Sequence, residues 1–271
     1  MKANKTKVMA ALAAGAVLAA AQIGARAAED AAADTADRQA RKAQMRAAML
    51  RKTGGFVFRE DAAKGKVVFV DAQSTLHASN MTFVAAEMRR MTHFRTECVK
   101  GTGNRARELK EKFGADVLVA AVSDPDAPVL LVAPEEHWAA VNVDRLGDGL
   151  KSEAAKAKFV ESRYRKELMR AFAFAAGGTS SQFPGNTMQT ATLAELDLCP
   201  EMVPYDCISK SQAFMKKLGM APATMATYRP ACTLGWAAQP TNEIQKAIWD
   251  EVHAMPTAPI KIKPETKKVR D

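Results

Sequence analysis

Apolar residues in the first half of the chain recur with two alternating periodicities. Short runs rich in β-branched residues predict strands, and stretches with apolar positions three or four residues apart predict helices between them. The strands are expected at 66–71, 93–99 and 115–123, and the helices at 81–91 and 104–113. Ser79 or Asn80 is the expected N-cap of the first helix, and Gly114 closes the second. Strands that alternate with helices imply a partly parallel sheet.

Two further apolar runs and one long helix follow. The runs at 129–133 and 137–143 are separated by Pro134-Glu135-Glu136, which predicts a hairpin. Residues 153–176 form one helical pattern whose second half, LMRAFAFAA, is almost entirely apolar, so we expect this helix to be deeply buried. Shorter helices are predicted at 193–198, 209–218 and 241–253.

The first residues of the chain show the three parts of a secretory signal peptide. Lys2, Lys5 and Lys7 precede an apolar run of about fourteen residues, and Ala25-Arg26-Ala27 is a small-x-small cleavage pattern. A membrane span needs roughly 20 apolar residues, so the run is too short for an anchor. We therefore expect an exported protein, periplasmic or extracellular, with no transmembrane span after cleavage. The expected divisions are a signal peptide at 1–27, a charged Ala-rich helical leader at 28–54, one domain at 55–255 and a basic Pro- and Lys-rich tail at 256–271.

Charge and aromatic content exclude a nucleic-acid partner. The formal charge of +9 includes Lys2, Lys5, Lys7 and Arg26, so the chain without its signal carries about +5. The basic residues are scattered and only 6% of the residues are aromatic, which provides neither a phosphate-binding stripe nor a base-stacking platform.

The cysteine count favours disulfides in an exported chain. Four cysteines allow three pairings, and Cys199 with Cys207 is the preferred pair because two prolines between them can turn the chain. Cys98 and Cys232 are the remaining candidates. No C-x-x-C pair exists, which argues against a zinc site built from these cysteines.

The sequence argues against a dinucleotide-binding site and against a hydrolase triad. Residues 101–106 match G-x-G-x-x-A between a strand and a helix, but the preceding strand carries Arg95, Glu97 and Lys100 where a buried central strand should be apolar. No G-x-S-x-G is present, and the four histidines stand apart from any serine or cysteine placed to form a triad.

The long helix carries the most informative positions. A zinc peptidase presents H-E-x-x-H on such a helix, because residues four apart share one face and two imidazoles can then bind one Zn²⁺. Here the five positions read Lys166-Glu167-Leu168-Met169-Arg170. Taken alone, this is an ordinary charged helix face.

The flanking sequence resembles the archaemetzincin-like branch of the metzincins between Lys66 and Met188. In that family a βαβαβ segment leads to an edge strand ending in an S-x-x-R-L-like sequence, and the zinc helix follows. Here the strand that begins at Trp138 ends in Asn142-Val-Asp-Arg145-Leu146, and Asn186-Thr-Met188-Gln is a candidate for the methionine turn, somewhat farther from the helix than in the family. The resemblance implies a zincin-like, three-layer α/β (α+β) domain with a mixed, mainly parallel twisted sheet, an edge hairpin strand and a central long helix.

If the resemblance holds, the departures from the family determine the function. Lys166 and Arg170 replace the helical histidines, and Ala173 and Ala176 stand at the motif glycine and the third ligand, so no zinc or other cofactor is expected. Glu167 is then more plausible as an ion-pair partner for Arg163 or Arg170. A metal held by distant histidines and cysteines stays open.

The resemblance therefore implies a pseudo-peptidase that binds a peptide, protein or envelope component. Its binding patch would consist of Arg145, Arg163, Lys166, Glu167 and Arg170, although these charges could equally satisfy only one another. Two alternatives remain: an exported hydrolase with an unrecognised site in residues 179–236, and a structural envelope protein.

Overall fold

The computed structural model describes residues 53–72, 78–179 and 181–254, together with Arg41, Gln44, Met45 and Ala48. The predicted signal peptide, nearly all of the leader and the tail lie outside the described residues. The chain divides into two compact units, one of residues 1–43 and 59–224 and the other of residues 44–58 and 225–271. The single domain expected over 55–255 thus corresponds to parts of both units, and each unit is described by itself.

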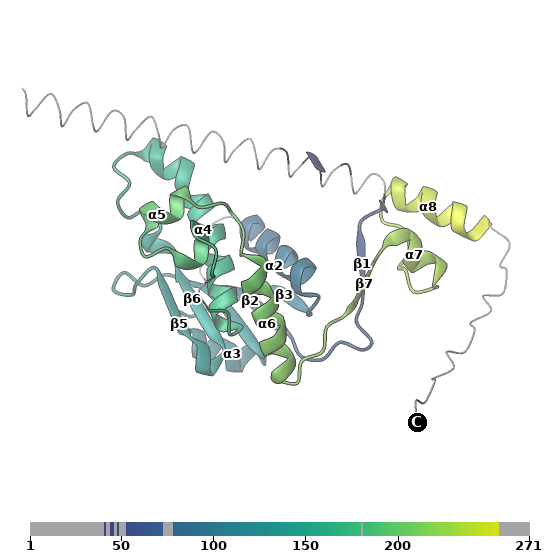
Figure 1. The fold of residues 1–271 in the computed structure, drawn as a ribbon, viewed down its shortest axis with the longest axis horizontal. Helices are drawn as coiled ribbons and strands as arrows, with labels where there is room; N and C mark the ends of the chain where they lie inside the picture. The colour runs from purple at the N-terminus through teal and green to yellow at the C-terminus, as the bar shows by residue number, and fades with distance from the viewer. Residues whose placement is uncertain are drawn as a thin grey trace, which may run out of the picture. The chain divides into compact units, whose positions relative to one another are not determined.

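The larger unit is built on one five-stranded sheet (Figure 1). Its strands are β2 (Val67–Asp71), β3 (Thr96–Lys100), β4 (Val117–Val122), β5 (Leu130–Ala133) and β6 (Trp138–Asn142). They lie in the order β3-β2-β4-β6-β5, and only β5 runs antiparallel to its neighbour. Every residue of β2 and β4 is buried, which explains why these two strands read as continuous apolar runs. The mixed, mainly parallel sheet is as predicted.

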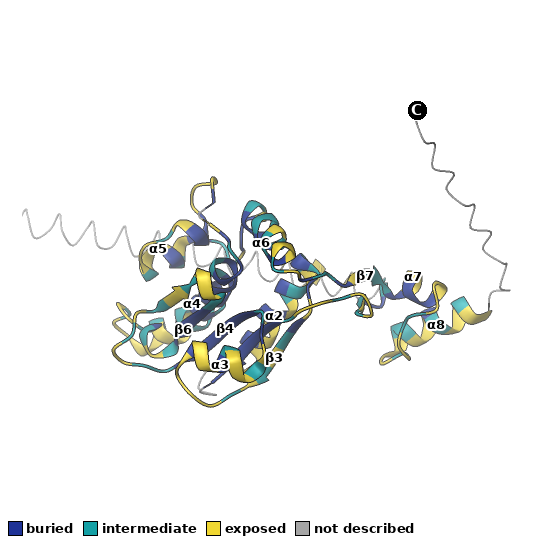
Figure 2. Ribbon diagram, turned by 90° about the horizontal axis from the view of Figure 1, so that it is seen from below, coloured by how far each residue is buried: buried dark blue, intermediate teal, exposed yellow. Residues whose placement is uncertain are grey.

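Helices cover both faces of this sheet. On one face α2 (Ala78–Thr92), α4 (Glu153–Ala175) and α6 (Tyr205–Lys217) share a core in which the rings of Phe69 and Phe172 stack at 6.2 Å. On the other face α3 (Ala106–Phe113) packs Leu109 against Val68 and Val70. Alternate residues of β2 therefore pack into different cores, one on each face of the sheet. The unit has three layers, with the buried strands between α4 and α3 (Figure 2).

The predicted βαβαβ segment and the hairpin are confirmed, and three details are wrong. The strand expected at the sheet edge, β6, pairs with both β4 and β5, so the edge strand is β5. Helix α2 begins at Ala78, and Asn80 lies within it, where its side chain accepts a hydrogen bond from Arg165. Helix α6 begins at Tyr205 and not at Ser209, because Asp206 in the first turn favours an earlier start after Pro204.

Shorter elements complete the larger unit. They are the 3₁₀ turns η1 (Pro134–Glu136), η2 (Val143–Arg145) and η3 (Thr187–Gln189), and the helix α5 (Leu193–Leu198), which has the predicted bounds. Thr192 caps α5 and forms a capping box with Glu195. The segment between α4 and α6 is therefore structured at two points, η3 and α5.

The smaller unit has a small core of its own. Strand β1 (Phe56–Arg59) pairs with β7 (Thr224–Thr227), and α7 (Tyr228–Thr233) packs on α8 (Glu243–Ala254) around Tyr228, Cys232 and Ile248. Only α8 is predicted from the sequence pattern. Among the described residues of either unit, no helix combines the length and apolar character needed to cross a membrane.

Candidate functional site

Four of the five residues predicted as a binding patch lie along one face of α4. Positions 163, 166, 167 and 170 are three or four residues apart, so their side chains leave the helix in similar directions. Arg163, Lys166 and Glu167 are buried, and the Arg170 side chain is only 13% exposed. Their partners are backbone and side-chain groups of residues 146–148 and 190–197.

Arg163 joins three segments of the chain. Its Nε and Nη2 donate to the two carboxylate oxygens of Asp197 at 2.8 and 2.7 Å, and its Nη1 donates to the carbonyls of Leu146 and Asp148 at 2.8 and 2.9 Å. This bidentate geometry is the strongest that arginine forms with a carboxylate. Arg163 therefore holds α5 and the loop after η2 against α4.

Lys166 caps the end of α5. Its Nζ donates to the carbonyls of Leu196 and Asp197 at 2.8 and 3.5 Å, and the Leu196 carbonyl also accepts the backbone N–H of Cys199 at 3.1 Å. A cation is favourable at this end of a helix. Burial nevertheless lowers the pKa of Lys166, and the nearby Asp197 carboxylate opposes this effect.

Glu167 and Arg170 form the expected ion pair. Arg170 Nη1 donates to Glu167 Oε1 at 2.7 Å, and Arg170 Nη2 donates to the carbonyl of Thr190 at 2.9 Å. Within the part of the chain that the structure describes, Glu167 Oε2 and Arg170 Nε are buried without a hydrogen-bond partner. Burial raises the pKa of Glu167, against the opposing effect of Arg170.

The raised pKa of Glu167 predicts a pH-dependent contribution to stability. Because the pKa in the folded state lies above its usual value of 4.5, this group contributes stability that is fully present below that value and is lost as the pH rises through the folded pKa. In urea unfolding at a series of pH values, the unfolding free energy of the wild type minus that of Glu167→Gln should fall from pH 4.5 toward neutrality. Glu161→Gln, on the same helix but with its side chain 46% exposed, is the control for loss of a carboxylate. A difference that does not vary with pH would contradict this.

The two other predicted residues do not lie on α4. Arg145, whose side chain is 42% exposed, pairs with the Asp148 carboxylate at 2.6 Å, and the carbonyl of the same Asp148 accepts from Arg163. Met188 lies in η3, 3% exposed within the main core, and its backbone N–H donates to the side chain of Asn186.

The residues at the zinc-helix positions do not fit a zinc ion. Lys166 and Arg170 are donors only and already bind carbonyl oxygens. Ala173 and Ala176 are fully buried and have no side-chain donor atom for a metal. Among the described residues, no group of three or more His, Cys, Asp or Glu side chains is placed to hold a metal. We derive no metal-dependent step from these residues.

The structure does not contain the predicted Cys199–Cys207 disulfide and holds all four cysteines as free thiols. Cys199 donates to the carbonyl of Glu195 at 3.4 Å and Cys207 to that of Thr179 at 3.1 Å, so the two thiols face different segments. Burial raises the pKa of both thiols, which favours the unreactive form. Cys98 is exposed on β3, and Cys232 lies in the core of the smaller unit.

Among the described residues, no strand pairs with the outer side of the edge strand β5. Asn142 N–H donates to the carbonyl of Val129 at 2.8 Å. In an antiparallel pair of strands, every second residue directs its N–H and C=O toward the partner strand, so this bond determines which residues of β5 face β6. Leu130 and Val132 then fall at positions whose N–H and C=O point away from β6. The side chains of Leu131 and Val132 are 44% and 37% exposed, and β5 contains no charged residue.

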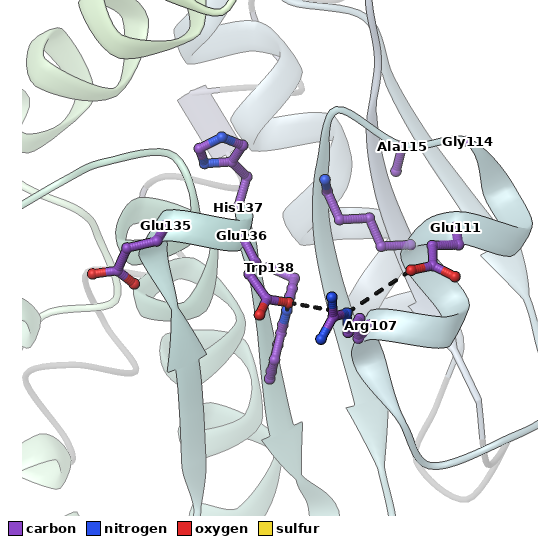
Figure 3. A pocket seen from close by; sticks show the side chains of 9 residues that line it. Arg107, Glu111, Gly114, Ala115, Glu135, Glu136, His137 and Trp138 are labelled. Atoms are coloured by element: carbon purple, nitrogen blue, oxygen red, sulfur yellow. Dashed lines mark hydrogen bonds and ion pairs between the residues drawn. The ribbon is translucent and has the colours of Figure 1, made fainter.

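A surface hollow was missed by sequence reasoning. It has a volume of about 520 Å³ and lies between the end of α3 and the start of β6, lined by residues that include Arg107, Glu136 and Trp138 (Figure 3). No sequence motif could have found it, because its residues come from two separate segments, 107–115 and 135–138.

No family model and no curated protein matches this sequence. Similar solved structures include archaemetzincin from Methanopyrus kandleri, with 15% identity, a TM-score of 0.42 and coverage of 56% of this chain and 96% of that chain. A zinc-dependent peptidase from Methanocorpusculum labreanum has 15% identity and a TM-score of 0.40, with 54% and 100% covered. Archaemetzincin from Archaeoglobus fulgidus, complexed with malonate, has 12% identity and a TM-score of 0.39, with 54% and 99% covered. Two of these three solved structures are archaemetzincins.

Proposed function

We propose that this chain is an exported, non-catalytic protein of metzincin-like fold that binds an extended polypeptide segment along β5. The observation that carries the proposal is the open edge of β5, where Leu130 and Val132 direct their backbone N–H and C=O groups away from the sheet. An extended peptide can pair with such an edge through its own backbone.

The side chains of β5 suit such a partner. Edge strands that avoid pairing carry charged residues or proline, whereas β5 reads Leu-Leu-Val-Ala. Leu131 and Val132 lie on opposite faces of the strand, so a bound peptide would meet an apolar side chain above and below its own backbone.

The non-catalytic part of the proposal rests on the α4 side chains. Arg163, Lys166 and Arg170 donate to carbonyls of the chain itself, and the ion pair with Arg170 occupies one oxygen of Glu167. These contacts favour a role in holding residues 190–197 over a role in chemistry. Export is proposed from the signal-peptide pattern at 1–27.

Binding along β5 should depend on the outward N–H of Val132. With the chain recovered after export, whose N-terminus is expected near Ala28, peptides are selected from a displayed random library and their affinities measured by calorimetry. Val132→Pro removes this N–H, and proline is tolerated where the N–H of an edge strand faces solvent. We expect about a tenfold loss of affinity from the lost hydrogen bond and the bulk of the ring. Val132→Ala keeps the N–H and should lose much less.

Hydrogen exchange provides a second readout of the same site. Bound peptide should slow exchange of the Leu130 and Val132 amides, whereas the inward amides of Leu131 and Ala133 are already in the ladder. Equal peptide affinities of Val132→Pro and the wild type would contradict the proposal of binding along β5. One tightly bound zinc per chain together with cleavage of the peptide would overturn its non-catalytic part. Light scattering of the protein without peptide measures its oligomeric state, which distinguishes peptide binding at β5 from dimerisation through two β5 edges.

A further inference from the structure

The hollow beside α3 is lined by α3 and the turn after it on one side, and by η1 and the start of β6 on the other. Gly114 ends α3 in the left-handed conformation, with φ 55°, and His137 ends η1 in the same conformation, with φ 61°. A side chain added at Gly114 would meet nothing within 4 Å, so this end of α3 borders open space. The hollow lies at the amino ends of β4 and β6, and all its residues belong to the larger unit.

Its β6 rim is held in place by specific contacts. The Trp138 indole N–H donates to Glu136 at 2.8 Å, which orients that carboxylate. The His137 ring contacts Pro134 O through Nδ1 at 2.8 Å and packs edge-on against Phe214 at 5.2 Å. A carboxylate beside an aromatic ring is therefore presented on a pre-formed rim.

The chain itself places a cation in this hollow. The Arg107 guanidinium lies between Glu136 and Glu111, as Figure 3 shows, with Nε at 3.5 and 3.9 Å from their carboxylate oxygens. The Arg107 side chain is 70% exposed, and those of Glu111 and Glu136 are 75% and 44% exposed. Ion pairs this long and this exposed contribute little, so Arg107 is easily displaced.

An aromatic surface accompanies the carboxylates that hold Arg107. The carboxylates of Glu111 and Glu136 face the Arg107 guanidinium, and the Glu135 side chain points away from it (Figure 3). The indole of Trp138 adds an aromatic surface of the kind that attracts organic cations. The hollow is thus chemically suited to a cationic group with an apolar stem.

We propose that this hollow is a binding site for an organic cation, a guanidinium or primary ammonium group carried on an alkyl chain, which displaces Arg107 from Glu136. The carboxylate of Glu136 takes the charge, and Trp138 contacts the stem. Arg107 occupies the free site and competes with the ligand. This site is separate from the outer edge of β5 and its occupation does not require the peptide.

Small cations of matched shape test the proposal on the full chain. Butylguanidinium and butylammonium chloride are titrated against the protein, with butanol as the uncharged analogue, and the Trp138 indole N–H is followed by NMR. Both cations should produce saturable shifts and butanol should not. Glu136→Gln should weaken binding about tenfold, because a charge-assisted contact becomes a neutral one. Arg107→Ala should strengthen binding several-fold by removing the competitor.

Glu108→Gln is the matched control, since it removes a carboxylate from α3 that pairs with Arg105 and does not line the hollow. Val132→Pro should leave cation binding unchanged, which separates this site from the peptide site. Saturable binding of butanol, equal affinities in Glu136→Gln and Glu108→Gln, or weaker binding in Arg107→Ala would each overturn the proposal. Unfolding curves of the variants establish that each is folded before binding is measured.

Discussion

Replacing Arg163 with alanine is expected to lower the free energy of unfolding by about 3–5 kcal/mol, the loss typical of breaking a buried ion pair from one side. The substitution leaves the Asp197 carboxylate, whose side chain is 15% exposed, without its bidentate partner. It also removes the donor that satisfies the carbonyls of Leu146 and Asp148. Urea unfolding followed by circular dichroism measures the change.

Arg145→Ala is the control. Like Arg163, Arg145 pairs with an aspartate, in this case Asp148, but the Arg145 side chain is 42% exposed. Its loss should change the unfolding free energy by no more than about 0.5 kcal/mol. The double variant Arg163→Met/Asp197→Leu should recover much of the stability, since apolar residues can replace a buried pair at little cost. A loss below about 1 kcal/mol in Arg163→Ala would show that Arg163 is not essential to holding α5.

Gly177→Ala is expected to cost about 2–4 kcal/mol, from a strained backbone and a steric clash together. Gly177 follows the end of α4 with φ 72°, a conformation that alanine adopts only at a cost. A Cβ at this position would also lie 2.4 to 2.9 Å from ring atoms of Phe214. Thermal and urea unfolding of the variant measure the loss.

Gly219→Ala separates the two effects. Gly219 has φ 80°, but a Cβ there would meet nothing within 4 Å, so this variant carries the backbone cost alone, about 1 kcal/mol. Equal losses in the two variants would mean that Phe214 moves aside without cost. In that case the ring is not a fixed boundary for the end of α4.

Local sequence patterns predicted most of the strands and helices, because the apolar run of a buried strand and the capping residues of a helix are both visible within a few neighbouring residues. The apolar runs of β2 and β4, the glycine after α3 and the bounds of α5 are all readable from neighbouring residues. The position of β6 inside the sheet was not readable, since strand order depends on partners far away in the chain. Strands β1 and β7 were missed because each is four residues long and its strand partner, the other of the two, lies far away in the chain.

The candidate site was predicted in part for the same reason. Helical spacing places Arg163, Lys166, Glu167 and Arg170 on one face and pairs Glu167 with Arg170. Their other partners are mostly carbonyl oxygens of residues 146–148 and 190–197, and every residue has such an oxygen, so no sequence signal marks them. The hollow beside α3 likewise depends on how two separate segments, 107–115 and 135–138, are placed in the fold.

The capping of α5 by Lys166 has a consequence for how the protein folds. A helix of six residues has no stability of its own in water, because nucleation costs more than so few hydrogen bonds return. Helix α5 is therefore stabilised by its packing on α4 and by the contacts of Arg163 and Lys166 with its last turn. We therefore expect the two helices, though separated by seventeen residues, to unfold together as one cooperative unit.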